Sequence, residues 1–303
     1  MHPAFGVNPH VAAIDAPPIP TAQAWKAAYD GRQGPMIDLS QAVPGLPPPA
    51  EFLDRLAAAA GSADAARYGP ILGDPDLREA LAADTARTYR GAVGADNVAI
   101  TSGCNQAFVV AMLALAQAGD SVILPAPWYF NHRMTLDMLG IATRILPCRI
   151  EDGFVPYPEA AERLIDASTR AIVLVSPNNP TGAVYPQDII ARFADLARRR
   201  GIALVLDETY RDFLPADQPR AHALFEDTHW GATLVQLYSF SKSHAIPGHR
   251  LGAIIAAPAF IAQVAKIQDS LQICPARPAQ RVAAWAIDAL RPWREARRAE
   301  LGR

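Results

Sequence analysis

The stretch TLVQLYSFSKSHAIPGHRLG, residues 233–252, places a lysine shortly after an apolar run. The run TLVQLYS predicts a buried strand. Lys242 then stands between two serines, and Arg250 follows a few residues later. At this position Lys242 is either a solvated loop charge or a nucleophile at the floor of a site. The remaining segments of the chain decide between these two interpretations.

Short apolar runs alternate with amphipathic patterns through the middle of the chain. Strands are predicted at residues 97–101, 121–125, 142–147, 171–176, 202–207 and 233–239, and helices at 105–117, 129–140, 158–167 and 186–200. Continuous apolar strands separated by such helices indicate a parallel sheet that is covered on both faces. We therefore predict a three-layer α/β/α fold with a mostly parallel sheet. Residues 1–50, which are rich in proline and glycine, are expected to form an irregular arm.

Composition narrows the classes of function. The chain has 303 residues, is 50% hydrophobic and has a formal net charge of −2, which indicates neither a nucleic-acid groove nor an anionic membrane surface. The apolar run at 107–118 is too short to span a bilayer, and residues 1–20 do not resemble a secretory signal. Cys104, Cys148 and Cys274 fit neither a disulfide framework nor a zinc pattern, so we expect a reducing, cytoplasmic setting and no metal.

Ligands of parallel sheets bind beyond the carboxyl ends of the strands. Residues 102–107, SGCNQA, form a small-residue turn that opens a helix, which is either an anion seat or a plain tight turn. Residues 126–132, APWYFNH, offer aromatic side chains that either stack on a planar ligand or cap the core. Asn179 lies in the stiff loop PNNPTG, residues 177–182, where its amide can bond a ligand.

Two further strand ends carry charge. Asp207, which opens DETY, is either a helix N-cap or a buried anion aimed at a cationic ligand nitrogen. Arg250 suits a phosphate group, and a lysine in a partly dry, cationic setting has a lowered pKa and can be a nucleophilic amine. Together these groups match the needs of pyridoxal phosphate, whose signature is a lysine Schiff base and a partner for the pyridinium nitrogen.

Several motifs along the chain resemble those of the class I and II aminotransferases, which are fold-type I pyridoxal-phosphate enzymes. They are YGPILGDPDLREAL (68–81), TSGCNQA (101–107), PWYFNH (127–132), SPNNPTG (176–182), LDETY (206–210) and SFSKSHAIPGHRLG (239–252). The resemblance runs from about residue 41 to the end of the chain. It implies an aspartate aminotransferase-like fold and pyridoxal 5'-phosphate as cofactor. It also implies transfer of the amino group of an L-amino acid to a 2-oxo acid, as part of amino acid metabolism.

The resemblance also implies roles for single residues. Lys242 would form the aldimine with the cofactor and later move a proton, and Asp207 would pair with the pyridinium nitrogen. Tyr210 and Asn179 would bond the phenolic oxygen, while Tyr129, in preference to its neighbour Trp128, would stack on the ring. The phosphate would be bound by Gly103, Cys104, Asn105, Ser239, Ser241 and Arg250.

Two more residues gain a role only through the resemblance. His132 occupies a place where some family members have a histidine behind the aspartate of the ring. Tyr68 resembles a tyrosine that reaches the phosphate in the partner subunit, which implies a homodimer.

The sequence departs from the family pattern at two places. Ala42 lies where the family usually has a glycine, in a loop that walls the substrate. The chain stops at Arg303, inside the helix that leaves the large domain. We expect an N-terminal arm and the start of a small domain at 1–50, a large cofactor-binding domain at 51–290, and the start of an interdomain helix at 291–303. The C-terminal small domain, with the arginine that clamps the substrate carboxylate, would then be missing.

Other functions remain open on the same residues. A C–S lyase of the same fold would use nearly the same cofactor contacts, and a truncated chain could bind the cofactor without turnover. A regulator with a DNA-binding domain is disfavoured, because no basic domain precedes the motifs. A nicotinamide dehydrogenase is disfavoured too, because no G-x-G-x-x-G follows an early strand. The motifs do not identify the amino donor.

Overall fold

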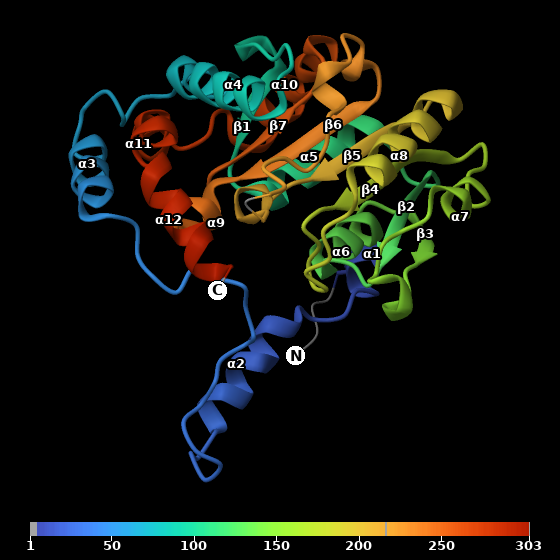
Figure 1. Cartoon of the computed structure of the whole chain (residues 1–303), viewed down its shortest axis with the longest axis horizontal. Coiled ribbons are helices and arrows are strands. Elements are labelled where there is room, and N and C mark those ends of the chain that lie inside the picture. Colours follow the sequence, from blue (N-terminus) through green and yellow to red (C-terminus); the bar gives the residue numbers. More distant parts are fainter. Residues whose placement is uncertain (1–4, 216, 303) are drawn as a thin grey trace.

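The computed structural model describes residues 5–215 and 217–302 and has one central sheet of seven strands (Figure 1). The strands lie in the order β1-β7-β6-β5-β4-β2-β3. Every neighbouring pair is parallel except the two that involve β7. The predicted α/β fold with a mostly parallel sheet is therefore confirmed. The strands are β1 Val98–Thr101, β2 Ser121–Ala126, β3 Ala142–Pro147, β4 Thr169–Val175, β5 Ala203–Asp207, β6 Leu234–Ser239 and β7 Gly252–Ile255.

Strand β7 was not predicted, and it runs against its neighbours. It pairs antiparallel with β6, so that Gly252 lies opposite Ser239. A parallel return needs a crossover of a dozen or more residues, usually with a helix. The segment 240–251 contains only single helical turns, so β7 returns beside β6 in the opposite direction. This return keeps the Lys242 and Arg250 loop at the carboxyl end of β6.

Helices cover both faces of the sheet. The helices are α1 Pro9–Ala12, α2 Pro18–Ala28, α3 Ala50–Ala60, α4 Pro75–Tyr89, α5 Cys104–Leu115, α6 Phe130–Met138, α7 Pro158–Glu162, α8 Gln187–Arg200, α9 Phe240–Ser243, α10 Pro258–Gln272, α11 Arg277–Ala289 and α12 Arg291–Leu301. The helices predicted at 105–117, 129–140 and 186–200 are confirmed within two residues at each end. The helix predicted at 158–167 is too long, because α7 ends at Glu162.

Alternate residues of each strand build two apolar layers, because successive side chains of a strand point to opposite faces. On β4, Ile172 and Leu174 pack into the layer formed with α3, α4, α8 and α11. Ala171 and Val173 pack into the other layer, formed with α5, α6 and α10. This double coverage explains why the central strands read as unbroken apolar runs.

The N-terminal arm is more regular than predicted. The expectation of an irregular segment at 1–50 is wrong for α1 and α2, while residues 1–4 lie outside the described part of the chain. Proline is tolerated in the first helical turn, where its missing N–H has no intrahelical partner, and Pro18 opens α2 in this way. Helix α2 projects from the body (Figure 1).

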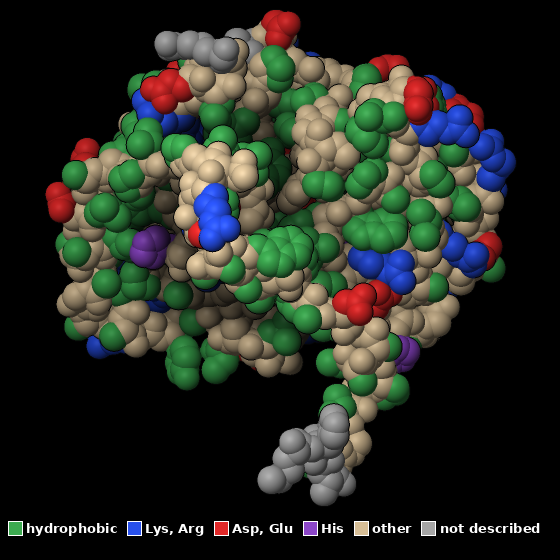
Figure 2. All heavy atoms as spheres, turned by 90° about the horizontal axis from the view of Figure 1, so that it is seen from below, with side chains coloured by type: hydrophobic (Ala, Val, Ile, Leu, Met, Phe, Trp, Pro, Cys, Tyr) green, Lys and Arg blue, Asp and Glu red, His purple; other side chains and the backbone are tan. Residues whose placement is uncertain are grey.

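The arm leaves large apolar side chains in contact with solvent. Trp25, Ile37 and Leu39 are 73%, 81% and 88% exposed. Figure 2, which looks onto the side from which α2 projects, shows hydrophobic side chains spread over this face.

Candidate active site

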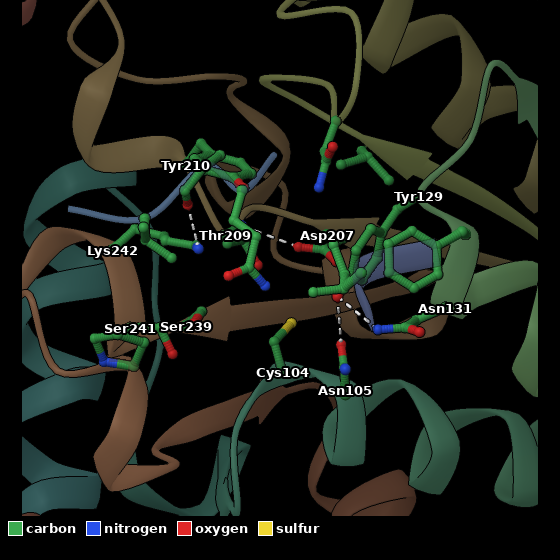
Figure 3. A pocket seen from close by; sticks show the side chains of 18 of the residues that line it. Cys104, Asn105, Tyr129, Asn131, Asp207, Thr209, Tyr210, Ser239, Ser241 and Lys242 are labelled. Atoms are coloured by element: carbon green, nitrogen blue, oxygen red, sulfur yellow. Dashed lines mark hydrogen bonds between the residues drawn. The ribbon is translucent and has the colours of Figure 1, made fainter. Parts of the chain in front are cut away.

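The carboxyl ends of β4, β5 and β6 open into a cavity of about 400 Å³ (Figure 3). Its walls come from strand ends, from the N-terminal end of α5 and from the arm. The residues predicted for the site that line it are Cys104, Asn105, Tyr129, Asn179, Asp207, Tyr210, Ser239, Ser241, Lys242 and Arg250. The tertiary structure thus brings together groups that the sequence spreads over about 150 residues.

Lys242 lies on α9, the single helical turn that follows β6. Ser239 caps this turn, because its Oγ accepts a hydrogen bond from the Ser241 N–H at 3.2 Å. The Lys242 amine faces the cavity and donates a hydrogen bond to the Ala42 carbonyl oxygen of the arm. Burial and the positive charge of Arg250 both lower the pKa of Lys242. A larger fraction of this amine is therefore neutral than for a lysine in water.

Asp207 ends β5 and is 4% exposed. Its Oδ1 accepts a hydrogen bond from the Thr209 N–H at 2.9 Å, and its Oδ2 lies 3.2 Å from His132 Nε2. Burial opposes ionisation of this carboxyl, but the bonds from His132 and Thr209 prevail and the pKa of Asp207 is lowered. Asp207 is therefore a buried anion at the cavity wall and caps no helix, since the next element is a 3₁₀ turn.

His132 lies behind Asp207, as the sequence resemblance implied. Its ring stacks on Phe108 at 4.0 Å between centroids and is almost fully buried. Nε2 faces the carboxylate, while Nδ1 has no hydrogen-bond partner within the described residues. The stacking fixes the ring plane, so the histidine holds one carboxylate oxygen in place.

Gly103 and Arg250 form the floor of the predicted anion seat. Gly103 has φ +87°, and a methyl group built on it would overlap the Arg250 guanidinium. Gly252 also leaves no room for a side chain, because a Cβ built on it would lie 2.7 Å from the Cys104 backbone nitrogen. The first N–H groups of α5 have no intrahelical partner, and they lie beside this guanidinium. Backbone donors and a fixed cation therefore converge on one small space.

Tyr129 lines the cavity at the N-terminal end of α6. Its hydroxyl donates to Asn105 Oδ1 at 3.2 Å and accepts from Asn131 Nδ2 at 2.8 Å, as Figure 3 shows. These two bonds fix the ring at the wall of the cavity. Trp128 does not line the cavity, and its ring lies 5.6 Å from the Arg133 guanidinium. Tyr129, and not Trp128, is thus among the residues that line the cavity, and its stacking on the ring stays a prediction.

The two adjacent asparagines after β4 do different things. Asn178 is buried and holds its own loop: its amide donates to Tyr185 Oη at 3.1 Å and its Oδ1 accepts from Thr181 Oγ1 at 2.8 Å. Asn179 lines the cavity instead. Tyr210 faces the same space, and its ring centroid lies 6.0 Å from Lys242 Nζ. Burial and the charge of Asp207 raise the pKa of Tyr210 to about 12, so it keeps its proton.

The structure adds lining residues that the sequence did not single out. Residues 40–43 and Ile19 come from the arm, Phe130 and Asn131 come from the first turn of α6, and Thr209 follows the end of β5. For Ala42, the resemblance had already implied a loop that walls the substrate. Thr209 could have been found, because an Asp-x-Thr run at a strand end lets the carboxylate accept the N–H two residues on.

Tyr68 lies outside this cavity. Its side chain is 77% exposed and is not among the lining residues. Within one chain, therefore, the structure does not bring Tyr68 to the other predicted residues. Its predicted role in a partner subunit stays a prediction.

The sequence model for aminotransferase class I and II matches residues 34–302. The chain belongs to this family. An aromatic aminotransferase of Arabidopsis thaliana is 31% identical over 263 residues, which is 85% of this chain and 65% of that protein. A valine–pyruvate aminotransferase of Mycobacterium tuberculosis is 32% identical over 261 residues, or 86% of this chain and 66% of that protein. The chain thus spans about two thirds of the length of these relatives.

Solved structures of the family share the fold. The aspartate aminotransferase from Thermus thermophilus with maleate superposes with a TM-score of 0.87 at 26% identity, over 97% of this chain and 77% of that one. In residues 5–215 and 217–302, no helix has the length and apolarity needed to cross a membrane. The same residues contain no cluster of three or more metal-ligating side chains.

The residues of the cavity fit pyridoxal phosphate, on which this family depends. The amine of Lys242 can form a Schiff base with the cofactor aldehyde, and the buried carboxylate of Asp207 suits a protonated ring nitrogen. The space kept free by Gly103 beside Arg250 suits a phosphate, which is the third charged part of the cofactor. These are independent features of the cavity, and each matches a different part of one molecule.

Proposed function

We propose that this chain forms the cofactor site of a pyridoxal-phosphate-dependent aminotransferase that moves the amino group of an L-amino acid to a 2-oxo acid. The observation that carries the proposal is that Lys242 and Asp207 face one cavity from neighbouring strands, with the Gly103–Arg250 anion seat on its floor. Family membership supports the same activity, because the relatives described above are aminotransferases.

Pyridoxal phosphate supplies an aldehyde that condenses with an amine as water leaves, and a protonated ring that accepts the electron pair released at the substrate Cα. Lys242 would hold the aldehyde end of the cofactor, and its amine, once released by substrate, would take and return the Cα proton at Nζ. The lowered pKa of Lys242 favours this proton transfer, because an amine accepts a proton only in its neutral form.

Asp207 would hold the proton of the ring nitrogen. Its carboxylate is ionised, and His132 and Thr209 fix both of its oxygens, so no reorganisation is needed when charge develops on the ring. Tyr210 and Asn179 would bond the phenolic oxygen, and Tyr129 would pack against the ring. Phosphate binding would fall to Arg250, Ser239, Ser241 and the backbone of residues 103–105.

We also propose which segments of the chain form each part of the protein. Residues 51–290 would form the cofactor-binding domain, because all of the proposed cofactor contacts in the cavity come from this range. Residues 1–50 would form an arm and the start of a small domain that closes the cavity, since Ile19 and Ala42 line it. Residues 291–303 would begin an interdomain helix. A homodimer and a cytoplasmic location complete the proposal.

The first test uses the absorption spectrum of the purified chain with pyridoxal phosphate. The sequence has three lysines, Lys26, Lys242 and Lys266. We expect a borohydride-reducible, lysine-bound cofactor that Lys242→Ala abolishes. Lys266→Ala is the matched control, because Lys266 lies on α10 and its amine bonds Gln263 away from the cavity. Reducible cofactor that persists in Lys242→Ala, on mass analysis of the peptides, would refute the assignment.

The same preparation tests the reaction. Addition of L-amino acids, one at a time, should convert the cofactor to its amine form with release of an equal amount of 2-oxo acid. Steady release of 2-oxo acid with ammonia, and without the amine form, would instead identify a lyase. Binding without any change on addition of every amino acid would identify a cofactor-binding chain that does not turn over.

A further inference from the structure

Behind the turn that carries Lys242 lies a chain of buried polar side chains. Tyr238 Oη donates to Asp212 Oδ2 at 2.8 Å and lies 3.1 Å from Ser243 Oγ. Ser243 Oγ in turn lies 2.9 Å from His244 Nδ1. Tyr238, Ser243 and His244 are 1%, 3% and 0% exposed, so water does not take the place of these bonds. Buried hydroxyls are costly unless they are bonded.

Only one arrangement of protons satisfies all three contacts. Burial and the charge of Arg294 lower the pKa of His244 to about 3, so its ring is neutral. The Asp212 carboxylate only accepts, because its pKa is lowered by Arg294 and Arg211 against the effect of burial. Tyr238 therefore donates to Asp212 and accepts from Ser243, and Ser243 accepts from the Nδ1–H of His244. Nε2 of His244, which has no hydrogen-bond partner within the described residues, then carries a lone pair.

Asp212, at the acidic end of this row of side chains, is held by a residue of α12. Arg294 Nη1 donates to Asp212 Oδ1 at 2.7 Å, and Arg294 Nη2 donates to the Ile287 carbonyl of α11 at 2.7 Å. On the other side of Tyr238, the Arg211 guanidinium lies 4.0 Å from the ring centroid and bonds Asp84 on α4 at 2.9 Å. The tyrosine is thus clamped between an ion pair and a stacked cation.

This row of buried, hydrogen-bonded side chains connects the two turns that carry Tyr210 and Lys242. Asp212 lies two residues after Tyr210, and Ser243 lies directly after Lys242. On α9, Ser241 and Lys242 face the cavity, whereas Ser243 faces the interior. A helical turn of four residues is not stable by itself, because nucleation of a helix is unfavourable. Its place must come from bonds such as that of Ser243.

We propose that Tyr238 and Ser243 are positioning residues that fix the Lys242 amine relative to Tyr210, with Asp212 and Arg294 as their anchor. The inference rests on the proposed function, since it concerns the covalent attachment of the cofactor to Lys242. Neither Tyr238 nor Ser243 is among the residues that line the cavity. They hold the turn on the side away from the cavity, so that the Lys242 amine loses little conformational entropy when it bonds the aldehyde.

The test compares two forms of the cofactor. Pyridoxal phosphate has the aldehyde that bonds Lys242, whereas pyridoxamine phosphate has an amine there and makes no such bond. In Ser243→Ala we expect the Kd of pyridoxal phosphate to rise about tenfold, which is the effect of losing one to two buried hydrogen bonds. The Kd of pyridoxamine phosphate should change less than about twofold. The yield of borohydride-reducible attachment should fall together with the affinity for the aldehyde.

Ser121→Ala is the matched control. Ser121 is fully buried at the start of β2, and its hydroxyl contacts Ser168 Oγ at 3.0 Å and Thr169 Oγ1 at 3.2 Å. It therefore loses the same group and a similar number of contacts at the opposite end of the sheet. A general loss of stability would affect both variants and both cofactor forms alike.

Tyr238→Phe is the second variant, because it breaks the same chain without changing the sequence of α9. It should reproduce the selective loss of affinity for the aldehyde, even where Ser243→Ala fails to fold. Equal weakening of both cofactor forms, or no difference from Ser121→Ala, would overturn the inference. Wild-type chain that shows no reducible attachment at all would refute the proposed function instead, so the two failures are distinguishable.

Discussion

Gly103 illustrates how one residue sets the shape of the anion seat. Its φ of +87° is a conformation that side chains rarely adopt, and its missing Cβ leaves room for the Arg250 guanidinium. The charge of Asp207, in turn, depends on neighbouring side chains. Its charge is usable only because His132 and Thr209 bond it in a buried place.

Gly103→Ala should therefore weaken phosphate binding. The methyl group displaces Arg250, and loss of a charged hydrogen bond predicts a Kd for pyridoxal phosphate that is higher by about tenfold or more. Gly119→Ala is the matched control, since Gly119 has φ +92° but no atom within 4 Å of the added methyl. Pyridoxal, which lacks the phosphate, should bind both variants equally. Equal affinity of the two variants for pyridoxal phosphate, measured by titration, would contradict this account.

At the scale of elements, helix α8 shows how an amphipathic pattern becomes packing. Ile189, Ile190, Phe193 and Leu196 form its buried stripe, while its last turn carries exposed arginines and Gly201 ends it at φ +65°. The helix packs across the central strands whose carboxyl ends form the site. Its contribution to function is indirect, because it covers the apolar side chains of β4 and β5 and has no residue in the lining of the cavity.

Phe193→Ala should lower the free energy of unfolding by about 3–5 kcal/mol, because it opens a cavity at a fully buried position. Arg199→Ala on the exposed face of the same helix should change it by less than about 0.5 kcal/mol. Urea unfolding followed by circular dichroism measures both. A similar small effect for the two variants would show that α8 does not depend on this packing.

At the scale of the whole molecule, Tyr68 and several apolar side chains of the arm are exposed in the described part of the single chain. Tyr68 is 77% exposed, and the arm presents Trp25, Ile37 and Leu39 to solvent. In the proposed homodimer a second copy would cover this surface, and the resemblance implies that Tyr68 of one copy would reach the phosphate of the other. The proposed homodimer would thus account for both exposed features.

Mixed dimers test this exchange of residues. Tyr68→Phe should raise the Kd for pyridoxal phosphate by about tenfold, from loss of a hydrogen bond to a charged group. A mixed dimer of Tyr68→Phe with Lys242→Ala has one site in which both residues are intact. It should regain wild-type affinity at half of its sites, measured by titration of refolded mixtures. Recovery would be absent if Tyr68 served its own chain.

The sequence by itself determined the fold class and most of the site. Apolar runs and amphipathic helices specify a covered parallel sheet, and strand ends in such a sheet must meet at one edge, so Asp207, Asn179 and Lys242 were predictable. These features depend on local pattern and on one rule of topology. The assignment of Gly103 together with Arg250 to a phosphate came instead from the resemblance to the family motifs.

Only the tertiary structure showed what stands behind the residues that face the cavity. Asn178, next to the predicted Asn179, is buried and donates to Tyr185, a bond that no local sequence pattern indicates. Strand β7 likewise depends on how distant segments pack. The bond from Arg294 to Asp212 joins residues 82 positions apart. Such contacts come from the packing of distant elements, which local periodicity does not encode.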